Sequence, residues 1–150
     1  MNAFDLASAR RAAREDRLEV WVHEYLRGPG RNVEFSTGLH LKPRRWHGPV
    51  EAPLARLRRS CGPELEMPFR ETRELWEQAV SDFASRLEPV EAFPPLLVRY
   101  EQGQMVISDG NHRYAAYSQR GFAACWIVIW YPDEAEYAHH ESRGFRVSDL

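Results

Sequence analysis

The stretch that decides the fold runs from residue 105 to residue 121 and reads MVISDGNHRYAAYSQRG. Its opening residues, Met105 to Ile107, are apolar and predict a short strand. Residues 108–110, which are Ser-Asp-Gly, interrupt that strand. Residues 111–120 then predict a helix, and Gly121 is placed to end it. The stretch therefore predicts a strand that turns through glycine into a helix.

A helix that starts in this way attracts anions, because its first backbone N–H groups and its dipole point toward the turn. Gly110 lets an anion approach the backbone closely. Arg113 can bind phosphate oxygens through two parallel hydrogen bonds, and His112 can donate or carry a proton. Phosphate binding is therefore one interpretation. The alternative is purely structural, with Asp109 as a helix cap and the other residues forming a turn and a solvated first helical turn.

Residues 109–113, Asp-Gly-Asn-His-Arg, are followed by Tyr-Ala-Ala and resemble the signature of the ParB/sulfiredoxin superfamily. Members of that superfamily carry a Gly-x-x-Arg core at a strand–turn–helix junction, where it holds nucleotide phosphates. Gly110, His112 and Arg113 match both the sulfiredoxins and the related free-serine kinases. Asp109 matches the kinases.

The resemblance also implies roles for individual residues. It assigns cofactor binding to Gly110, Asn111, His112 and Arg113. It assigns catalysis to His112 and to Asp109, which would order the turn or hold Mg²⁺ through water. Asn111 stands where the sulfiredoxins carry their cysteine, so cysteine-based repair of sulfinic acids is not expected here.

The ligand implied by the resemblance is a nucleoside triphosphate, ATP or CTP, bound with Mg²⁺. Hydrolysis or phosphoryl transfer to a small molecule or a protein would follow, resting on positioning and charge stabilisation. In the kinase-like relatives a carboxylate from an early segment acts as the base. Three acidic residues fall in that region here without one standing out, and they are Glu64, Glu66 and Glu71.

The other segments follow in an order that resembles the ParB N-terminal domain. We expect a strand at 50–57, a loop at 58–70, a helix at 71–87, a hairpin of 96–100 with 105–107, and a strand at 125–130. This order predicts an α+β fold with a small mixed sheet and packed helices. We expect its core to contain Trp76, Val80, Phe83, Val98, Ile107, Ile127 and Ile129.

The chain divides by pattern into three parts. Residues 1–48 form an N-terminal extension, with a helix over 4–26 and a loop over 31–48. Residues 49–131 form the ParB/sulfiredoxin-like domain, and residues 132–150 form a polar tail that packs on it, with a short helix at 133–142. Within that helix Glu136, His139 and His140 have ligand chemistry, but adjacent histidines point apart on a helix, so no metal site is predicted.

Composition limits the classes of function. The chain has 150 residues and a net charge of −2, so no global basic field favours DNA. Acidic residues interleave the arginines of segment 8–17, which also argues against DNA binding. Two cysteines are too few for a disulfide framework and indicate a reducing cytoplasm, and we expect no leader peptide and no membrane span.

Two other functions stay open beside nucleotide chemistry. One is a non-catalytic ParB-like regulatory module that binds a protein or DNA through the arginine-rich first helix. The other is a nuclease, which is disfavoured because the sequence has no evident carboxylate cluster for two metal ions.

Overall fold

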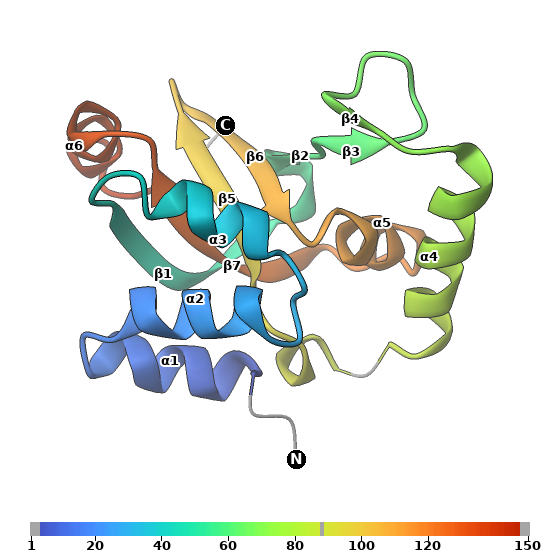
Figure 1. Ribbon diagram of the computed structural model, residues 1–150, viewed down its shortest axis with the longest axis horizontal. Helices are drawn as coiled ribbons and strands as arrows, with labels where there is room; N and C mark the ends of the chain where they lie inside the picture. The colour runs from blue at the N-terminus through green and yellow to red at the C-terminus, as the bar shows by residue number, and fades with distance from the viewer. Residues whose placement is uncertain (1–3, 88, 148–150) are drawn as a thin grey trace.

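A computed structural model describes residues 4–87 and 89–147 of the chain (Figure 1). The α-helices are α1 (Leu6–Arg14), α2 (Leu18–Arg27), α3 (Val33–Leu39), α4 (Arg73–Ser85), α5 (Asn111–Gln119) and α6 (Glu134–Ser142). The strands are β1 (Arg45–Pro53), β2 (Leu57–Arg58), β3 (Cys61–Gly62), β4 (Phe69–Arg70), β5 (Leu96–Glu101), β6 (Gln104–Asp109) and β7 (Ala124–Tyr131). Short 3₁₀ helices lie at Leu54–Arg56 and Val90–Ala92.

The main sheet has five strands in the order β1-β7-β5-β6-β2. β7 pairs antiparallel with β1 and parallel with β5, while β5 and β6 form an antiparallel hairpin. β2 pairs parallel with β6 over two residues. The sheet is therefore mixed, and the predicted α+β class is confirmed. None of the described helices combines the length and the hydropathy that crossing a bilayer requires.

Alternation along β5 sends neighbouring side chains to opposite faces of the sheet. Leu96 and Val98 belong to a core with β1, β6, β7 and α5. Leu97, between them, belongs to a second core with Val128 and the apolar sides of α1 and α2. Figure 1 shows α1 and α2 stacked below the sheet. The N-terminal helices thus close one face of the sheet, and α5 lies on the other.

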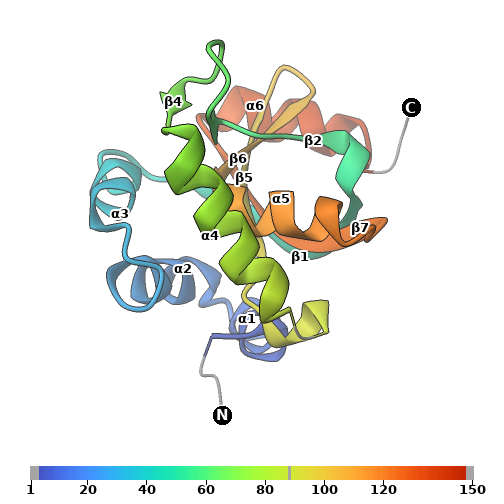
Figure 2. The ribbon, with the colours of Figure 1, turned by 90° about the vertical axis from the view of Figure 1, so that its right-hand side faces the viewer.

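The predicted core residues are buried, apart from the half-buried Phe83, and they fall into two clusters. Val98, Ile107, Ile127 and Ile129 are fully buried in the sheet core. Trp76 and Val80 instead form a smaller cluster between α4 and α5, against which the half-buried Phe83 packs. Figure 2 shows α4 passing in front of α5 at one end of the molecule. Helix α4 therefore packs on α5, and α5 packs on the sheet.

Several predicted boundaries were wrong. The single helix over 4–26 is two helices, because Asp16 adopts a left-handed backbone with φ 59° and turns the chain. The predicted loop at 31–48 contains α3, capped by Asn32, and the start of β1. The predicted loop at 58–70 contains β3 and β4, which pair in parallel as a separate two-stranded sheet.

Candidate functional site

The strand, turn and helix predicted from residues 105–121 are present. β6 runs to Asp109, which pairs with Leu97, so this strand is longer than predicted. Gly110 then adopts φ 106°, and α5 begins at Asn111. A Cβ atom on Gly110 would lie 2.5 Å from Cδ2 of the fully buried Leu96. The turn therefore requires glycine for both its backbone conformation and its lack of a side chain.

Arg113 points into the protein, and only 3% of the residue is exposed. Its guanidinium donates to the backbone carbonyl of Pro94 and, through Nη2, to the hydroxyl of Tyr25 at 3.4 Å. Nη2 also lies 3.7 Å from Oδ2 of Asp109. Burial raises the pKa of Tyr25 to about 12, so its hydroxyl stays neutral beside this cation. Arg113 thus lies beneath the turn, and α2 helps to hold it there.

Asp109 and Asn111 also make structural contacts. Oδ1 of Asp109 accepts from Nδ2 of Asn32 at 3.4 Å, and its side chain is only 12% exposed. Oδ1 of the buried Asn111 accepts from the backbone N–H groups of Ser60, at 2.8 Å, and Cys61, at 3.2 Å. Asn111 therefore fastens the segment that leads into β3 to the first residue of α5.

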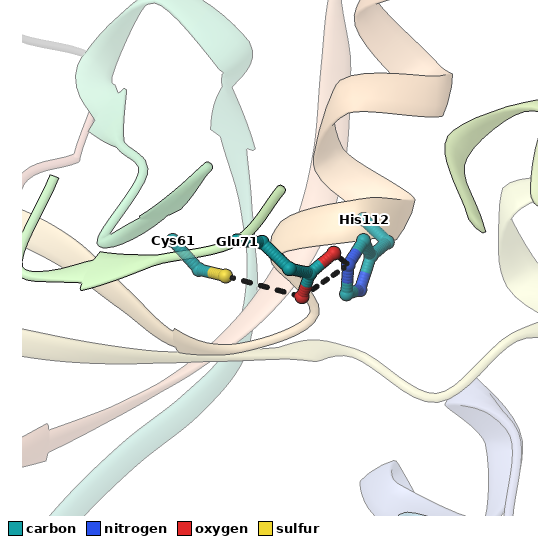
Figure 3. Close-up of side chains that lie close together, drawn as sticks. All are labelled: Cys61, Glu71 and His112. Atoms are coloured by element: carbon teal, nitrogen blue, oxygen red, sulfur yellow. Dashed lines mark hydrogen bonds and ion pairs between the residues drawn. The ribbon is translucent and has the colours of Figure 1, made fainter. Parts of the chain in front are cut away.

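His112 is the residue of the turn whose side chain reaches the surface. Its Nε2 lies 2.9 Å from Oε1 of Glu71, and the two side chains are 30% and 28% exposed. Cys61 completes the group, since its Sγ donates to Oε2 of Glu71 at 3.6 Å (Figure 3). The ring centre of Trp76 is 4.8 Å from that of His112. Burial, with the Glu71 carboxylate second, raises the pKa of the Cys61 thiol to about 11.

Two hollows lie beside this group. One, of about 400 Å³, is lined by Pro63, Arg70, Glu71, Thr72 and Arg73. The other, of about 300 Å³, is lined by Arg59, Trp76, Tyr114, Ala115, Ser118 and Gln119. The Arg59 guanidinium lies 4.9 Å above the ring of Trp76. Arginine residues therefore line both hollows, and Glu71 lines one of them.

The residues predicted for the site share one turn but face in different directions. Asp109, Asn111 and Arg113 face inward, and His112 faces the surface. Among the three acidic residues considered, Glu71 is the one that contacts His112. Cys61 was missed, because nothing near it in the sequence indicates that it meets residues 71 and 112.

The residues of the C-terminal helix do not form a cluster of ligands. Nδ1 of His139 lies 2.7 Å from the hydroxyl of Tyr100. Nδ1 of the buried His140 lies 2.7 Å from the hydroxyl of Tyr131, and its Nε2 is 3.0 Å from the carbonyl of Arg146. These histidines therefore attach α6 to the sheet.

No protein-family model matches the chain, and no curated protein matches it. Among solved structures, it is similar to C-terminally truncated chromosome-partitioning protein ParB from Caulobacter crescentus complexed to the centromeric parS site, with 26% identity and a TM-score of 0.40 over 58% of this chain and 41% of that chain. It is also similar to the same ParB complexed with CTP-gamma-S, with 23% identity and a TM-score of 0.39 over 73% and 56% of the two chains. The chain thus covers less than two thirds of either ParB chain.

A third similar structure is sulfiredoxin from Arabidopsis thaliana, with 22% identity and a TM-score of 0.42 over 61% of this chain and 94% of that chain. ParB and sulfiredoxin are two of the three kinds of protein whose signature residues 109–113 resemble, and the free-serine kinases are the third. With TM-scores near 0.4, the likeness carries no further argument about this chain.

Proposed function

We propose that this chain binds the phosphate groups of a nucleoside triphosphate, ATP or CTP, at the start of α5. One observation carries the proposal. Glu71, which lies 2.9 Å from His112, also lines the hollow of about 400 Å³ that contains Arg70 and Arg73. Guanidinium groups bind phosphate oxygens in pairs of hydrogen bonds, so we assign Arg70 and Arg73, which line this hollow, to the phosphates.

The start of α5 adds to this attraction. Gly110 has no side chain to cap the first amides, which leaves the positive end of the helix dipole without a side-chain cap. A Cβ on Gly110 would lie 3.1 Å from Nη2 of Arg113, so this guanidinium lies directly behind the turn. In this proposal Arg113 acts as a buried positive charge beneath the phosphates, with Asp109 offsetting part of it. Buried charges are screened less than exposed ones.

His112 is the group that we place at the reacting phosphate. Its contact with Glu71 orients the imidazole, which can then donate or accept a proton during hydrolysis or phosphoryl transfer. When bound, the triphosphate with its Mg²⁺ supplies the phosphoryl group to be transferred. The Asp109 carboxylate already contacts Asn32 and Arg113, so we assign it to ordering the turn rather than to holding Mg²⁺.

Titration calorimetry of the full chain with ATP and CTP, each with and without Mg²⁺, tests the proposal. The double variant Arg70→Ala/Arg73→Ala is expected to lose at least about tenfold to hundredfold in affinity, since each charge-assisted contact contributes about 1.5–3 kcal/mol. The double variant Arg11→Ala/Arg14→Ala removes two exposed charges from α1 and is the matched control. It should bind like wild type.

His112→Ala should lower turnover more than affinity. The proposal is wrong if neither nucleotide binds at millimolar concentration. It is also wrong if the two double variants lose affinity equally, because the effect would then come from net charge alone.

DNA binding is a separate question, since one similar ParB structure is a complex with parS. The expectation that this chain does not bind DNA is therefore unsupported by the comparisons. Two arginines of the N-terminal segment have partners, because Arg10 lies 4.3 Å above the ring of Trp126 and Arg17 lies 2.9 Å from Glu15. We keep the prediction that this chain has little affinity for duplex DNA. Tight, salt-sensitive binding to a duplex at physiological ionic strength would overturn it.

A further inference from the structure

Three side chains of different ligand chemistry meet at the surface beside the start of α5. Cys61 comes from β3, Glu71 follows β4 directly, and His112 lies in the first turn of α5. Figure 3 shows the thiol and the imidazole on either side of the carboxylate. One donor atom of each residue lies within 4.8 Å of the other two. This grouping includes a thiol, which the proposed nucleotide binding does not use.

We propose that Cys61, Glu71 and His112 form a binding site for a transition-metal dication of the Zn²⁺ class, with its fourth position open to water or to a ligand oxygen. The distances fit such an ion. With Zn–S and Zn–O bonds of about 2.3 and 2.0 Å, a tetrahedral site separates sulfur from oxygen by about 3.5 Å. Here Sγ of Cys61 is 3.6 Å from Oε2 of Glu71.

The nitrogen–oxygen edge also fits. A tetrahedral site separates these ligand atoms by about 3.3 Å. Nε2 of His112 lies 2.9 Å and 3.2 Å from the two carboxylate oxygens of Glu71. The remaining edge joins Cys61 to His112, whose ligand atoms lie within 4.8 Å of each other, against about 3.5 Å in a tetrahedral site. Both side chains are partly exposed, so side-chain rotation can shorten this edge. The same exposure leaves an ion a path from solvent.

Contacts outside the three ligand atoms already hold the three residues close together. The side chain of Asn111 accepts from the N–H of Cys61, which links this ligand to the residue next to His112. The N–H of Glu71 donates to the carbonyl of Gly62 at 2.9 Å, next to Cys61. The Trp76 ring packs against the His112 imidazole. A site that needs little rearrangement loses less free energy on binding its ion.

The donor set selects the class of ion. A thiolate with an imidazole suits Zn²⁺ or Co²⁺, whereas Mg²⁺ prefers oxygen ligands. Three protein ligands are typical of sites that keep an open position, whereas structural zinc sites have four. The ion proposed for this site is therefore different from the Mg²⁺ that would accompany a nucleotide. Its open position lies beside the hollow that Glu71 lines.

Titration of the full chain with Co²⁺, followed by absorbance, tests the site. Wild type is expected to bind one Co²⁺ with a thiolate-to-metal charge-transfer band, which Zn²⁺ abolishes by displacement and excess Mg²⁺ does not. Cys61→Ser should lose the band. Glu71→Gln and His112→Ala should each weaken Co²⁺ binding by more than about tenfold, since loss of even an outer-shell partner costs about that much.

Cys125→Ala is the matched control, because the other cysteine is buried in the sheet. It should keep the band, and circular dichroism verifies that each variant is folded. Absence of the band in folded wild type overturns the proposal, as does a band that Cys61→Ser retains. The titration contains no nucleotide, and nucleotide binding can be measured on chelator-treated protein, so failure of either proposal leaves the other testable.

Discussion

The hydroxyl of Tyr25 lies 3.4 Å from Nη2 of Arg113, although 88 residues separate the two in the chain. Through this contact α2 supports the turn at the start of α5. The Arg113 guanidinium is therefore held in place by contacts within the protein. The arginine of the Gly-x-x-Arg pattern is therefore part of the core in this chain.

Arg113→Ala is expected to lower the free energy of unfolding by about 3–5 kcal/mol, because it leaves Asp109 and the Pro94 carbonyl without their buried partner. Tyr25→Phe removes only the hydroxyl and should cost about 1–2 kcal/mol, because the contact is long at 3.4 Å and Arg113 keeps Pro94 and Asp109 as partners. Urea unfolding followed by circular dichroism measures both. If Arg113→Ala unfolds at the wild-type urea concentration, the buried placement of this guanidinium is wrong.

Gly110→Ala and Gly121→Ala form a matched pair. Both glycines have positive φ, 106° and 78°, which costs an alanine about 1–2 kcal/mol. Only Gly110 has a neighbour in the way, since no atom lies within 4 Å of a Cβ on Gly121. Crowding against Leu96 should cost Gly110→Ala a further ~1–3 kcal/mol in unfolding free energy. Equal losses in the two variants would show that Leu96 moves aside freely.

Asn111→Ala should free the segment that carries Cys61. It removes the acceptor of two backbone N–H groups, one of them in the buried Ser60, and is expected to cost about 1–3 kcal/mol. Asn111→Asp keeps an acceptor at this position and places a negative charge in the first turn of a helix, where it is favoured. Amide hydrogen exchange at Ser60 should be fast in the alanine variant and slow in the aspartate variant. Slow exchange in both would contradict this role.

The stability of the fold should decline in mild acid because of His140. Burial, helped by Arg143 and His139, lowers the pKa of His140 below its ordinary value of 6.5. The unfolded chain then binds more protons than the folded one below that value, so stability is complete above pH 6.5 and is lost as pH falls toward the folded pKa.

His140→Gln cannot titrate and should flatten this decline, measured as unfolding free energy between about pH 7 and pH 5. Some slope should remain, because burial also lowers the pKa of His23 and His47. A variant as acid-sensitive as wild type would assign the decline to other groups.

Local pattern was sufficient for the elements that carry the site. The apolar residues of β6 and α5 and the glycine between them predict this strand, turn and helix. Hydrophobic periodicity and the backbone freedom of glycine depend only on residues that are close in the sequence. The long apolar stripe of α4 was equally clear. The break between α1 and α2 was missed, because a left-handed aspartate at residue 16 leaves no signal in hydrophobic periodicity.

The orientation of the site residues could not be predicted in the same way. The sequence alone indicates that Arg113 is an exposed cation in the first turn of a helix. Its burial depends on contacts with Tyr25 and Pro94, which are distant in the sequence. Glu71 could not be told from Glu64 and Glu66, because its contact with His112 depends on how the segment before α4 returns to α5. Side-chain direction at these positions is decided by tertiary contacts.

The strand order has a consequence for synthesis on the ribosome. β7 lies between β1 and β5, yet among the strands in the described part of the chain it is made last. Until it emerges, both neighbours have an unpaired edge, and α1 and α2 lack Val128, against which they pack. Exposed edges of this kind promote association between nascent chains. We expect a chain that stops before Ala124 to aggregate during expression, and a soluble, protease-resistant fragment would contradict this.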